Sequence, residues 1–260
     1  MTARASLKIL DIDGDGHDEF ILRNEWLYAV ISPSRGARLV YLFVRTSRGG
    51  ALVVGNPTDD WNFQEDLNRY MDTPSNHPGA LADAGHVHDR YRPTLVDVDG
   101  SALIEMTNVE EGSPLLGTTK AFFLSPDAAA LAVRYGTPGW LGELETDICL
   151  SPDYYRLLRR GRQTVLPIEG TLRRGYRNGD VSVWACLADD EATSWGEPAS
   201  PEVGHGFVLR VASRAASFHV LLGYGEADEE ACIGLLHRER GAMLRHAGAQ
   251  DIVTTREVSG

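Results

Sequence analysis

The chain has 260 residues, of which 43% are hydrophobic and 24% are charged, so it can bury a sizeable core. Its formal net charge of −12 excludes nucleic acid and anionic membranes as expected partners, because both bind basic surfaces. The three cysteines, Cys149, Cys186 and Cys232, show no metal-ligand spacing, and we expect buried free thiols. This cysteine usage, with no apolar signal segment at the start and no membrane-spanning run, predicts a cytoplasmic protein.

The first part of the chain predicts an antiparallel meander of short strands. A run at residues 8–10 leads into an acidic stretch, and the apolar runs that follow are separated by good turn residues. These runs cover residues 19–23, 27–31, 37–45 and 51–54. Residues 59–71 then break the pattern and predict one short helix carrying Trp61, and residues 73–83 predict a long loop.

From residue 90 the β pattern returns in short pieces that continue to residue 223. Two turns, at Asp99-Gly100 and Asn178-Gly179, predict hairpins. The basic stretch 154–162 is expected to form a turn of helix or a connection. Residues 227–245 have helical spacing, with the charged run 238–240 as the solvated face and the apolar side made of Ala231, Leu235, Leu236 and Met243.

Roughly fourteen to sixteen short strands follow one another without a linker, which is too many for a small sandwich. Stacked antiparallel sheets bury one face of each strand, so this many strands favour a large sandwich of two sheets. The sequence therefore predicts an all-β protein, a large antiparallel β-sandwich with one or two short helices. We expect it to form a single domain over residues 1–260.

The stretch from Asp11 to Glu19 predicts a calcium site. Asp11, Asp13 and Asp15 alternate, and carboxylates packed so closely repel one another unless a cation neutralises them. With the backbone carbonyl of His17 and the carboxylate of Glu19 they supply hard oxygen ligands, which suit calcium better than zinc or copper. The stretch does not continue as an EF-hand. A solvated Asp/Gly turn is the alternative interpretation; a bound calcium ion would be structural.

A second group of residues has the chemistry to bind a sugar. His86, His88 and Asp89 lie together, and His86 and His88 are expected to share one face of a strand. Trp61 offers an aromatic ring on which a sugar can stack. The alternative interpretation is that the two histidines are surface or hydrogen-bonded structural residues. Trp26 and Trp184 lie inside predicted strands, and we expect both in the core.

The acidic stretch, the apolar strand after it, Asn24-Glu25 and the aromatic strand ending at Ser32-Pro33 and Gly36 resemble one known domain. It is the C-terminal β domain of glycoside hydrolase family 57, the 4-α-glucanotransferase and α-amylase group. The resemblance implies a β-supersandwich of the galactose-mutarotase type and a calcium loop at Asp11, Asp13, Asp15 and Glu19. It is sharpest over residues 10–45 and looser over most of the remaining chain.

In that family the catalytic carboxylates belong to a separate barrel domain, so no residue here inherits a catalytic role. The resemblance therefore implies a module that supports or binds carbohydrate, an α-glucan or oligosaccharide, with a catalytic glycosidase domain or chain as partner. A mutarotase-like fold also leaves open aldose 1-epimerase chemistry by a His and a carboxylate. An adhesion-like module, in which the calcium loop supports a protein-binding face, is a third possibility.

Overall fold

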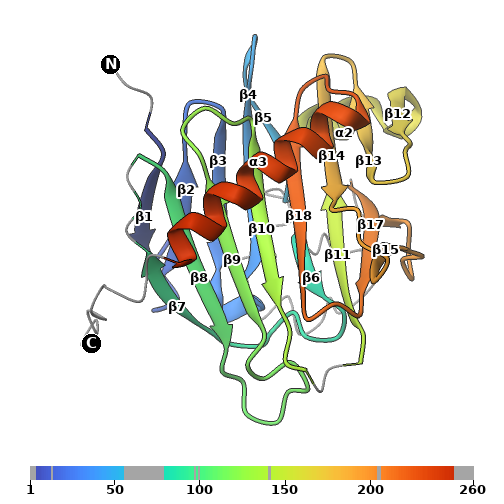
Figure 1. Cartoon of the computed structure of the whole chain (residues 1–260). Coiled ribbons are helices and arrows are strands. Elements are labelled where there is room, and N and C mark those ends of the chain that lie inside the picture. The colour runs from blue at the N-terminus through green and yellow to red at the C-terminus, as the bar shows by residue number, and fades with distance from the viewer. Residues whose placement is uncertain are drawn as a thin grey trace.

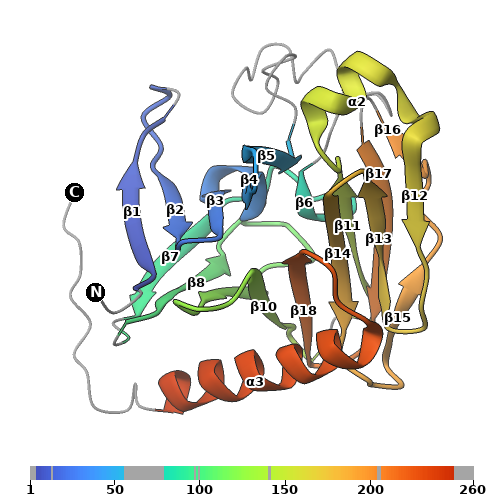
Figure 2. The same cartoon turned by 90° about the horizontal axis from the view of Figure 1, so that it is seen from above.

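The computed structural model describes residues 4–12, 14–55, 79–96, 98, 100–139, 142–203 and 206–248. Within these ranges two antiparallel β-sheets pack face to face, and helices lie on their outer faces (Figures 1 and 2). The prediction of a large antiparallel β-sandwich is confirmed. That all of residues 1–260 form one domain stays a prediction.

The first sheet contains most of the N-terminal strands and, beside them, strands from the second half of the chain. Its hydrogen-bonded order is β1 (Ser6–Leu10), β2 (Glu19–Arg23), β3 (Leu27–Ser32), β4 (Arg38–Thr46), β6 (Ala80–Asp83), β11 (Leu144–Leu150), β17 (Gly206–Ser213) and β15 (Thr193–Gly196). Two further strands attach at its sides, β5 (Gly49–Val54) on β4 and β16 (Glu202–Val203) on β17. A 3-10 turn, η1 (Pro33–Arg35), joins β3 to β4.

The second sheet is built from the middle and the C-terminal part of the chain. Its order is β12 (Val165–Ile168), β13 (Arg173–Asn178), β14 (Val181–Leu187), β18 (Ser217–Tyr224), β10 (Ala130–Gly136), β9 (Thr119–Leu124), β8 (Ala102–Asn108) and β7 (Tyr91–Val96). Both predicted hairpins are present, as β7–β8 and β13–β14. The basic stretch forms a short helix, α2 (Tyr154–Arg160), and a 3-10 turn, η2 (Arg162–Thr164).

The main hydrophobic core fills the space between the sheets. It is formed by alternate residues of the facing strands, such as Leu42 and Val44 of β4 with Phe122 of β9 and Val220 of β18. Strand side chains alternate between faces, so the opposite residues point outward. The three cysteines are free and buried, as predicted. No helix of the described ranges is long and apolar enough to cross a membrane.

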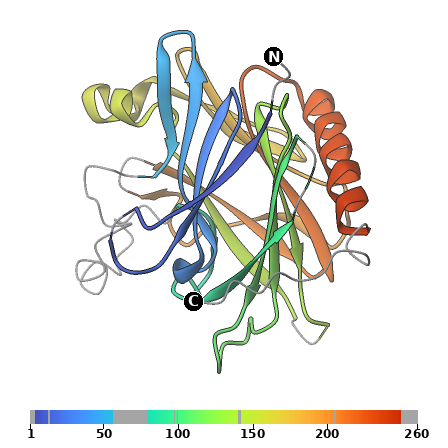
Figure 3. The ribbon, with the colours of Figure 1, turned by 90° about the vertical axis from the view of Figure 1, so that its left-hand side faces the viewer.

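The C-terminal helix α3 (Glu229–Gly248) lies across the outer face of the second sheet (Figure 3). Its buried apolar residues are Cys232, Leu236 and Met243, which pack on Trp184 and its neighbours. Trp184 is in the core of this helix–sheet layer, as predicted. A Cβ at Gly223 would lie 2.1 Å from the Trp184 ring, so only glycine leaves room for the indole on the next strand.

The predicted apolar face of α3 is confirmed at Leu236 and Met243 and is wrong at Ala231. Ala231 is exposed and Leu235 only half-buried, whereas Cys232 is buried. Glu239, expected in a solvated charged run, is buried and bonded by the guanidinium of Arg238. The helical period was predicted correctly. The charged stretch 238–240 was wrongly predicted to be fully solvated, because a paired carboxylate can be buried among apolar side chains.

One buried ion pair joins the two sheets. The Lys120 ammonium of β9 lies 2.9 Å from the Asp83 carboxylate of β6, and both side chains are almost fully buried. The same ammonium donates to the carbonyls of Gly36 (2.7 Å) and Leu81 (2.8 Å), so all three of its protons have acceptors. Burial lowers the pKa of Lys120, and the Asp83 charge acts in the opposite direction.

The Lys120→Met variant should lose about 3–5 kcal/mol of the free energy of unfolding, because Asp83 would remain as an uncompensated buried charge. Urea denaturation measures this loss. Lys8→Met is the matched control, since Lys8 is the chain's only other lysine and is exposed on β1. We expect part of the stability to return when Asp83→Asn is added. A loss below about 1 kcal/mol would contradict a paired, charged Lys120.

Stability should also fall in acid because of His219 on β18. Burial first, and then the charges of Arg240 and Arg134, lower the pKa of His219 from 6.5 to about 4. Between these two pH values the unfolded chain takes up a proton that the folded protein does not, so stability present above pH 6.5 is lost as the pH falls towards 4. In His219→Gln this loss should shrink by about 3 kcal/mol. An unchanged pH profile, equal to that of His237→Gln on exposed His237, would refute this.

Candidate functional site

The acidic stretch forms the turn of the β1–β2 hairpin, where Leu10 pairs with Glu19. One carboxylate oxygen of Asp11 accepts the amide of Gly14 (2.8 Å) and the other accepts the amide of Gly16 (3.1 Å). Both glycines have positive φ, 75° and 85°, so the chain coils around the Asp11 carboxylate. The turn is therefore organised by Asp11.

Two further acids in the described part of this turn, Glu19 and Asp15, face in different directions. Glu19 is fully buried, and its carboxylate accepts the amide of Ile12 (3.0 Å) and the hydroxyl of Ser32 (3.3 Å). Asp15 accepts the amide of His17 (2.8 Å) and lies 3.6 Å from the guanidinium of Arg35. These contacts tie the turn to the end of β3 and to η1.

The calcium prediction stays a prediction. Asp13 lies outside the described residues, and among the described residues no group of three or more His, Cys, Asp or Glu side chains is placed to hold a metal ion. The donor set itself suits a hard cation, because Asp11, Asp15 and Glu19 offer carboxylate oxygens. A carboxylate oxygen can accept more than one partner, so a bond from a backbone amide or a hydroxyl does not by itself exclude a cation.

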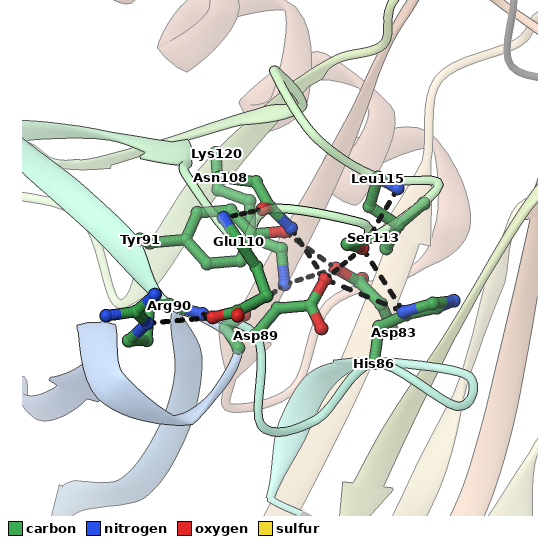
Figure 4. A network of polar contacts seen from close by, with 11 residues as sticks. Asp83, His86, Asp89, Arg90, Tyr91, Asn108, Glu110, Ser113, Leu115 and Lys120 are labelled. Carbon is green, nitrogen blue, oxygen red and sulfur yellow. Dashed lines mark hydrogen bonds and ion pairs between the residues drawn. The ribbon is translucent and has the colours of Figure 1, made fainter.

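His86, His88 and Asp89 lie in the loop between β6 and β7, so the prediction that the two histidines share a strand face is wrong. The loop is made of tight turns, in which the His86 amide donates to the Asp83 carbonyl (2.9 Å) and the Asp89 amide to the His86 carbonyl (3.3 Å). Turns this tight break strand alternation. His88 is consequently exposed, whereas His86 points towards Asp89 (Figure 4).

Asp89 is the centre of a polar cluster (Figure 4). One of its oxygens accepts the amide nitrogen of Asn108 (2.8 Å) and the hydroxyl of Ser113 (2.5 Å). The same oxygen lies 3.5 Å from Nδ1 of His86, and the Ser113 hydroxyl lies 3.4 Å from that nitrogen. The His86 and Asp89 side chains keep 25% and 12% of their surface exposed, so the cluster is reached from solvent.

The cluster does not have the geometry of a nucleophilic triad. In such a triad the acid and the nucleophile contact opposite nitrogens of the imidazole, which relays the proton. Here Ser113 and Asp89 both contact Nδ1, and Ser113 donates its proton directly to the carboxylate. The other ring nitrogen of His86 points away from both groups (Figure 4). This arrangement can accept or donate hydrogen bonds to a ligand, but it does not activate Ser113.

The loop is anchored beneath the cluster by the buried ion pair. The Gly36 amide donates to the Asp89 carbonyl (2.8 Å), and the Gly36 carbonyl accepts a hydrogen bond from the Lys120 ammonium. A Cβ at Gly36 would lie 3.1 Å from two loop carbonyls, and its φ of 74° also favours glycine. The hydroxyls of Tyr91 (3.1 Å) and Tyr135 (3.2 Å) donate to Asp83. Burial of the two phenols, and then the Asp83 charge, raises the pKa of both.

The remaining candidates are separate from this cluster. Trp61, proposed as a sugar platform, lies outside the described residues. Trp26, expected in the core, is 38% exposed because it belongs to the turn before β3. The acids of β11 are held by arginines instead of facing a ligand: Arg210 bonds both oxygens of Asp147 (2.7 and 2.9 Å) and also Glu145 (2.9 Å).

Sequence reasoning missed Asn108, Ser113 and Lys120. Asn108 and Ser113 lie about twenty residues from Asp89 in a stretch of ordinary turn composition. The pairing of β7 with β8 brings them to the loop, because Asn108 pairs with Tyr91. Lys120 carried a usable signal: it is one of two lysines, and it precedes the apolar run 121–124 on a predicted strand.

Comparison with known proteins identifies the fold of this chain but does not assign it to a family. No family model matches the chain, and no curated protein matches it. Among solved structures, a galactose mutarotase-like protein from Clostridium acetobutylicum has a TM-score of 0.52 at 9% identity, covering 86% of this chain and 98% of its own. A TPR-domain containing protein from Parabacteroides distasonis has a TM-score of 0.50 at 10% identity, covering 83% and 48%. The 4-alpha-glucanotransferase from Thermococcus litoralis has a TM-score of 0.48 at 14% identity, covering 86% and 40%.

The likeness to the galactose mutarotase-like protein defines the fold class. The chain is an all-β protein with a galactose mutarotase-like sandwich fold. It spans about two fifths of the glucanotransferase and about half of the TPR-domain protein. At identities of 9–14% the relationship lies at the level of the fold.

Proposed function

We propose that the protein is a carbohydrate-binding β-sandwich module, stabilised by calcium, that performs no chemistry unaided. The observation that carries the proposal is the His86–Asp89–Ser113 cluster, in which polar groups converge on a partly exposed loop held rigidly from below. Sugar hydroxyls are bound by such convergent donors and acceptors. The fold supports a carbohydrate context, since the structure with a TM-score of 0.52 is described as galactose mutarotase-like.

The geometry favours binding over epimerisation, the alternative function. An epimerase needs a general acid and a general base that reach different atoms of the sugar. His86 and Asp89 are 3.5 Å apart and in contact with each other, so they approach a ligand from one side. Other candidates are engaged or buried: Asp147 is bonded bidentately to Arg210, and His219 is buried.

The resemblance of the acidic turn to the family 57 β domain suggests an α-glucan or oligosaccharide as the ligand. It also suggests a catalytic glycosidase domain or chain as the partner, which this module would support. In that role calcium would hold the β1–β2 turn against η1 through Asp11, Asp15 and Glu19, with Asp13 and the His17 carbonyl completing the ligands.

Sugar binding is tested by isothermal titration calorimetry with maltooligosaccharides and, separately, with glucose. The module should bind the oligosaccharide, and His86→Ala should weaken binding about tenfold, the equivalent of one lost hydrogen bond to a polar ligand. His237→Ala, on the exposed face of α3, is the matched control and should bind normally. Failure to bind any sugar would refute the binding role. Mutarotation of glucose that His86→Ala abolishes would instead establish the epimerase alternative.

Calcium binding is tested by thermal melts in calcium and in chelator. Calcium at about one hundred times its dissociation constant should add about 2.7 kcal/mol and raise the melting temperature by roughly 5–10 °C. Asp13→Asn and Asp15→Asn should lose most of this rise. Asp18→Asn is the matched control, because Asp18 lies in the same turn and outside the predicted ligand set. Identical melts with calcium and chelator would leave the stretch as a solvated turn.

A further inference from the structure

A basic cavity lies beside helix α2, away from the sugar-binding cluster. It has a volume of about 270 Å³. Its lining consists of Arg48, Asp153, Tyr155, Arg156, Arg159 and Arg160. Four of these six residues carry a positive charge, in a chain whose net charge is −12. This local concentration of positive charge is opposite in sign to the net charge of the chain and favours a negatively charged ligand.

Three structural elements bring the arginines together. Arg156, Arg159 and Arg160 have the i, i+3, i+4 spacing that places side chains on one side of a helix. Arg48 comes from the tip of the β4–β5 hairpin, which lies beside α2 (Figures 2 and 3). The buried Tyr154 ring packs α2 onto this part of the sheet, through Leu52 of β5.

The third element is the β13–β14 turn, against which the Arg156 guanidinium lies. A Cβ at Gly179 would be 2.1 Å from Arg156 Nη1, so glycine makes room for the guanidinium at this turn. Nη1 lies 3.5 Å from the Asn178 carbonyl and 3.7 Å from the Asp180 carboxylate. The Nε of Arg156 is buried and has no hydrogen-bond partner among the described residues.

The acids close to the cavity neutralise only part of this charge. Asp180 is shared between Arg48 (3.2 Å) and Arg156 (3.7 Å). Asp153 is the N-cap of α2 and accepts the Arg156 amide (3.2 Å). In the part of the chain that the structure describes, no carboxylate pairs with the exposed Arg159 or Arg160. As far as the described residues go, two guanidinium groups of the cavity are therefore available to a ligand.

We propose that this cavity binds a small molecule through a phosphate or sulfate group. Guanidinium groups bind such oxyanions through paired, charge-assisted hydrogen bonds, which makes arginine better suited to the task than lysine. The volume corresponds to several water molecules and lies just below the usual range for drug-sized ligands. It therefore accommodates a free oxyanion or a monosaccharide phosphate. The half-exposed ring of Tyr155 offers an apolar wall for the body of the ligand.

This site is independent of the proposed carbohydrate cluster, with which it shares no residue. The experiment is isothermal titration calorimetry of the full chain in low salt with three probes: inorganic phosphate, inorganic sulfate and glucose 6-phosphate. Glucose is the uncharged comparison. We expect at least one anionic probe to bind and its affinity to fall with ionic strength. Tighter binding of glucose 6-phosphate than of phosphate would identify a sugar phosphate as the ligand; equal binding would identify a free oxyanion.

The Arg159→Ala/Arg160→Ala variant should weaken anion binding by about tenfold or more, because two charge-assisted contacts are lost. Both side chains are exposed, so folding should be unaffected. Arg92→Ala/Arg214→Ala is the matched control, since it removes the same charge from exposed positions outside the cavity. Equal affinity in the two double variants would reduce the effect to net charge and overturn the proposal. Absence of binding by the unaltered chain to all three anions would overturn it too.

Discussion

The structure depends on one buried ion pair, Lys120 with Asp83, which joins the two sheets of the sandwich. Removing a charge from water is costly, and such a pair is tolerated only when every proton and lone pair has a partner. Here the ammonium has three acceptors, and its nitrogen lies 5.3 Å from the ring centroids of both Tyr91 and Tyr135. A pair this specific fixes how one sheet is placed on the other more strictly than apolar packing alone, which is not directional.

The same ion pair positions the candidate sugar site. Asp83 ends β6 and begins the loop that carries His86 and Asp89, and Gly36 links that loop to Lys120 through its carbonyl. The polar cluster therefore rests on groups that cannot shift without separating buried charges. Rigid support of this kind lowers the entropy cost of binding, because the hydrogen-bonding groups are already in place. Burying the Lys120–Asp83 pair costs desolvation energy and adds little net stability. The pair is useful because it holds the loop of the polar cluster in place.

Lys120 and the arginines beside α2 have different roles in this chain. The two lysines are Lys8 and Lys120, and nearly all other positive charge is arginine. In the core, the compact ammonium of Lys120 reaches acceptors in three directions, which a planar guanidinium would not do in the same space. At the surface beside α2, the broad guanidinium groups of Arg156, Arg159 and Arg160 gather around a cavity. Arg35 and Arg38 are buried as well, so the contrast lies between these two sites and not between core and surface.

Much of the architecture was predictable from the sequence, because strand alternation and turn residues are local signals. Alternating apolar residues, with turns at Asp99-Gly100 and Asn178-Gly179, predicted the antiparallel sandwich and its hairpins. The acidic turn after β1 was located correctly, although its calcium ligands remain a prediction. The histidines were recognised as candidates, but their placement on a strand was wrong, since turn hydrogen bonds between Asp83 and Asp89 override the alternation.

Local sequence specified most of the strands and turns and the chemical types available at each site, although β6 lies where a loop was predicted. Which of those groups meet depends on how the sheets pair and pack. Asn108 and Ser113 reach Asp89 through strand pairing, Lys120 reaches Asp83 across two sheets, and Arg48 reaches α2 from a distant hairpin. These contacts join residues about twenty to more than a hundred positions apart. They are set by sheet order and sheet packing, which no short stretch of sequence encodes.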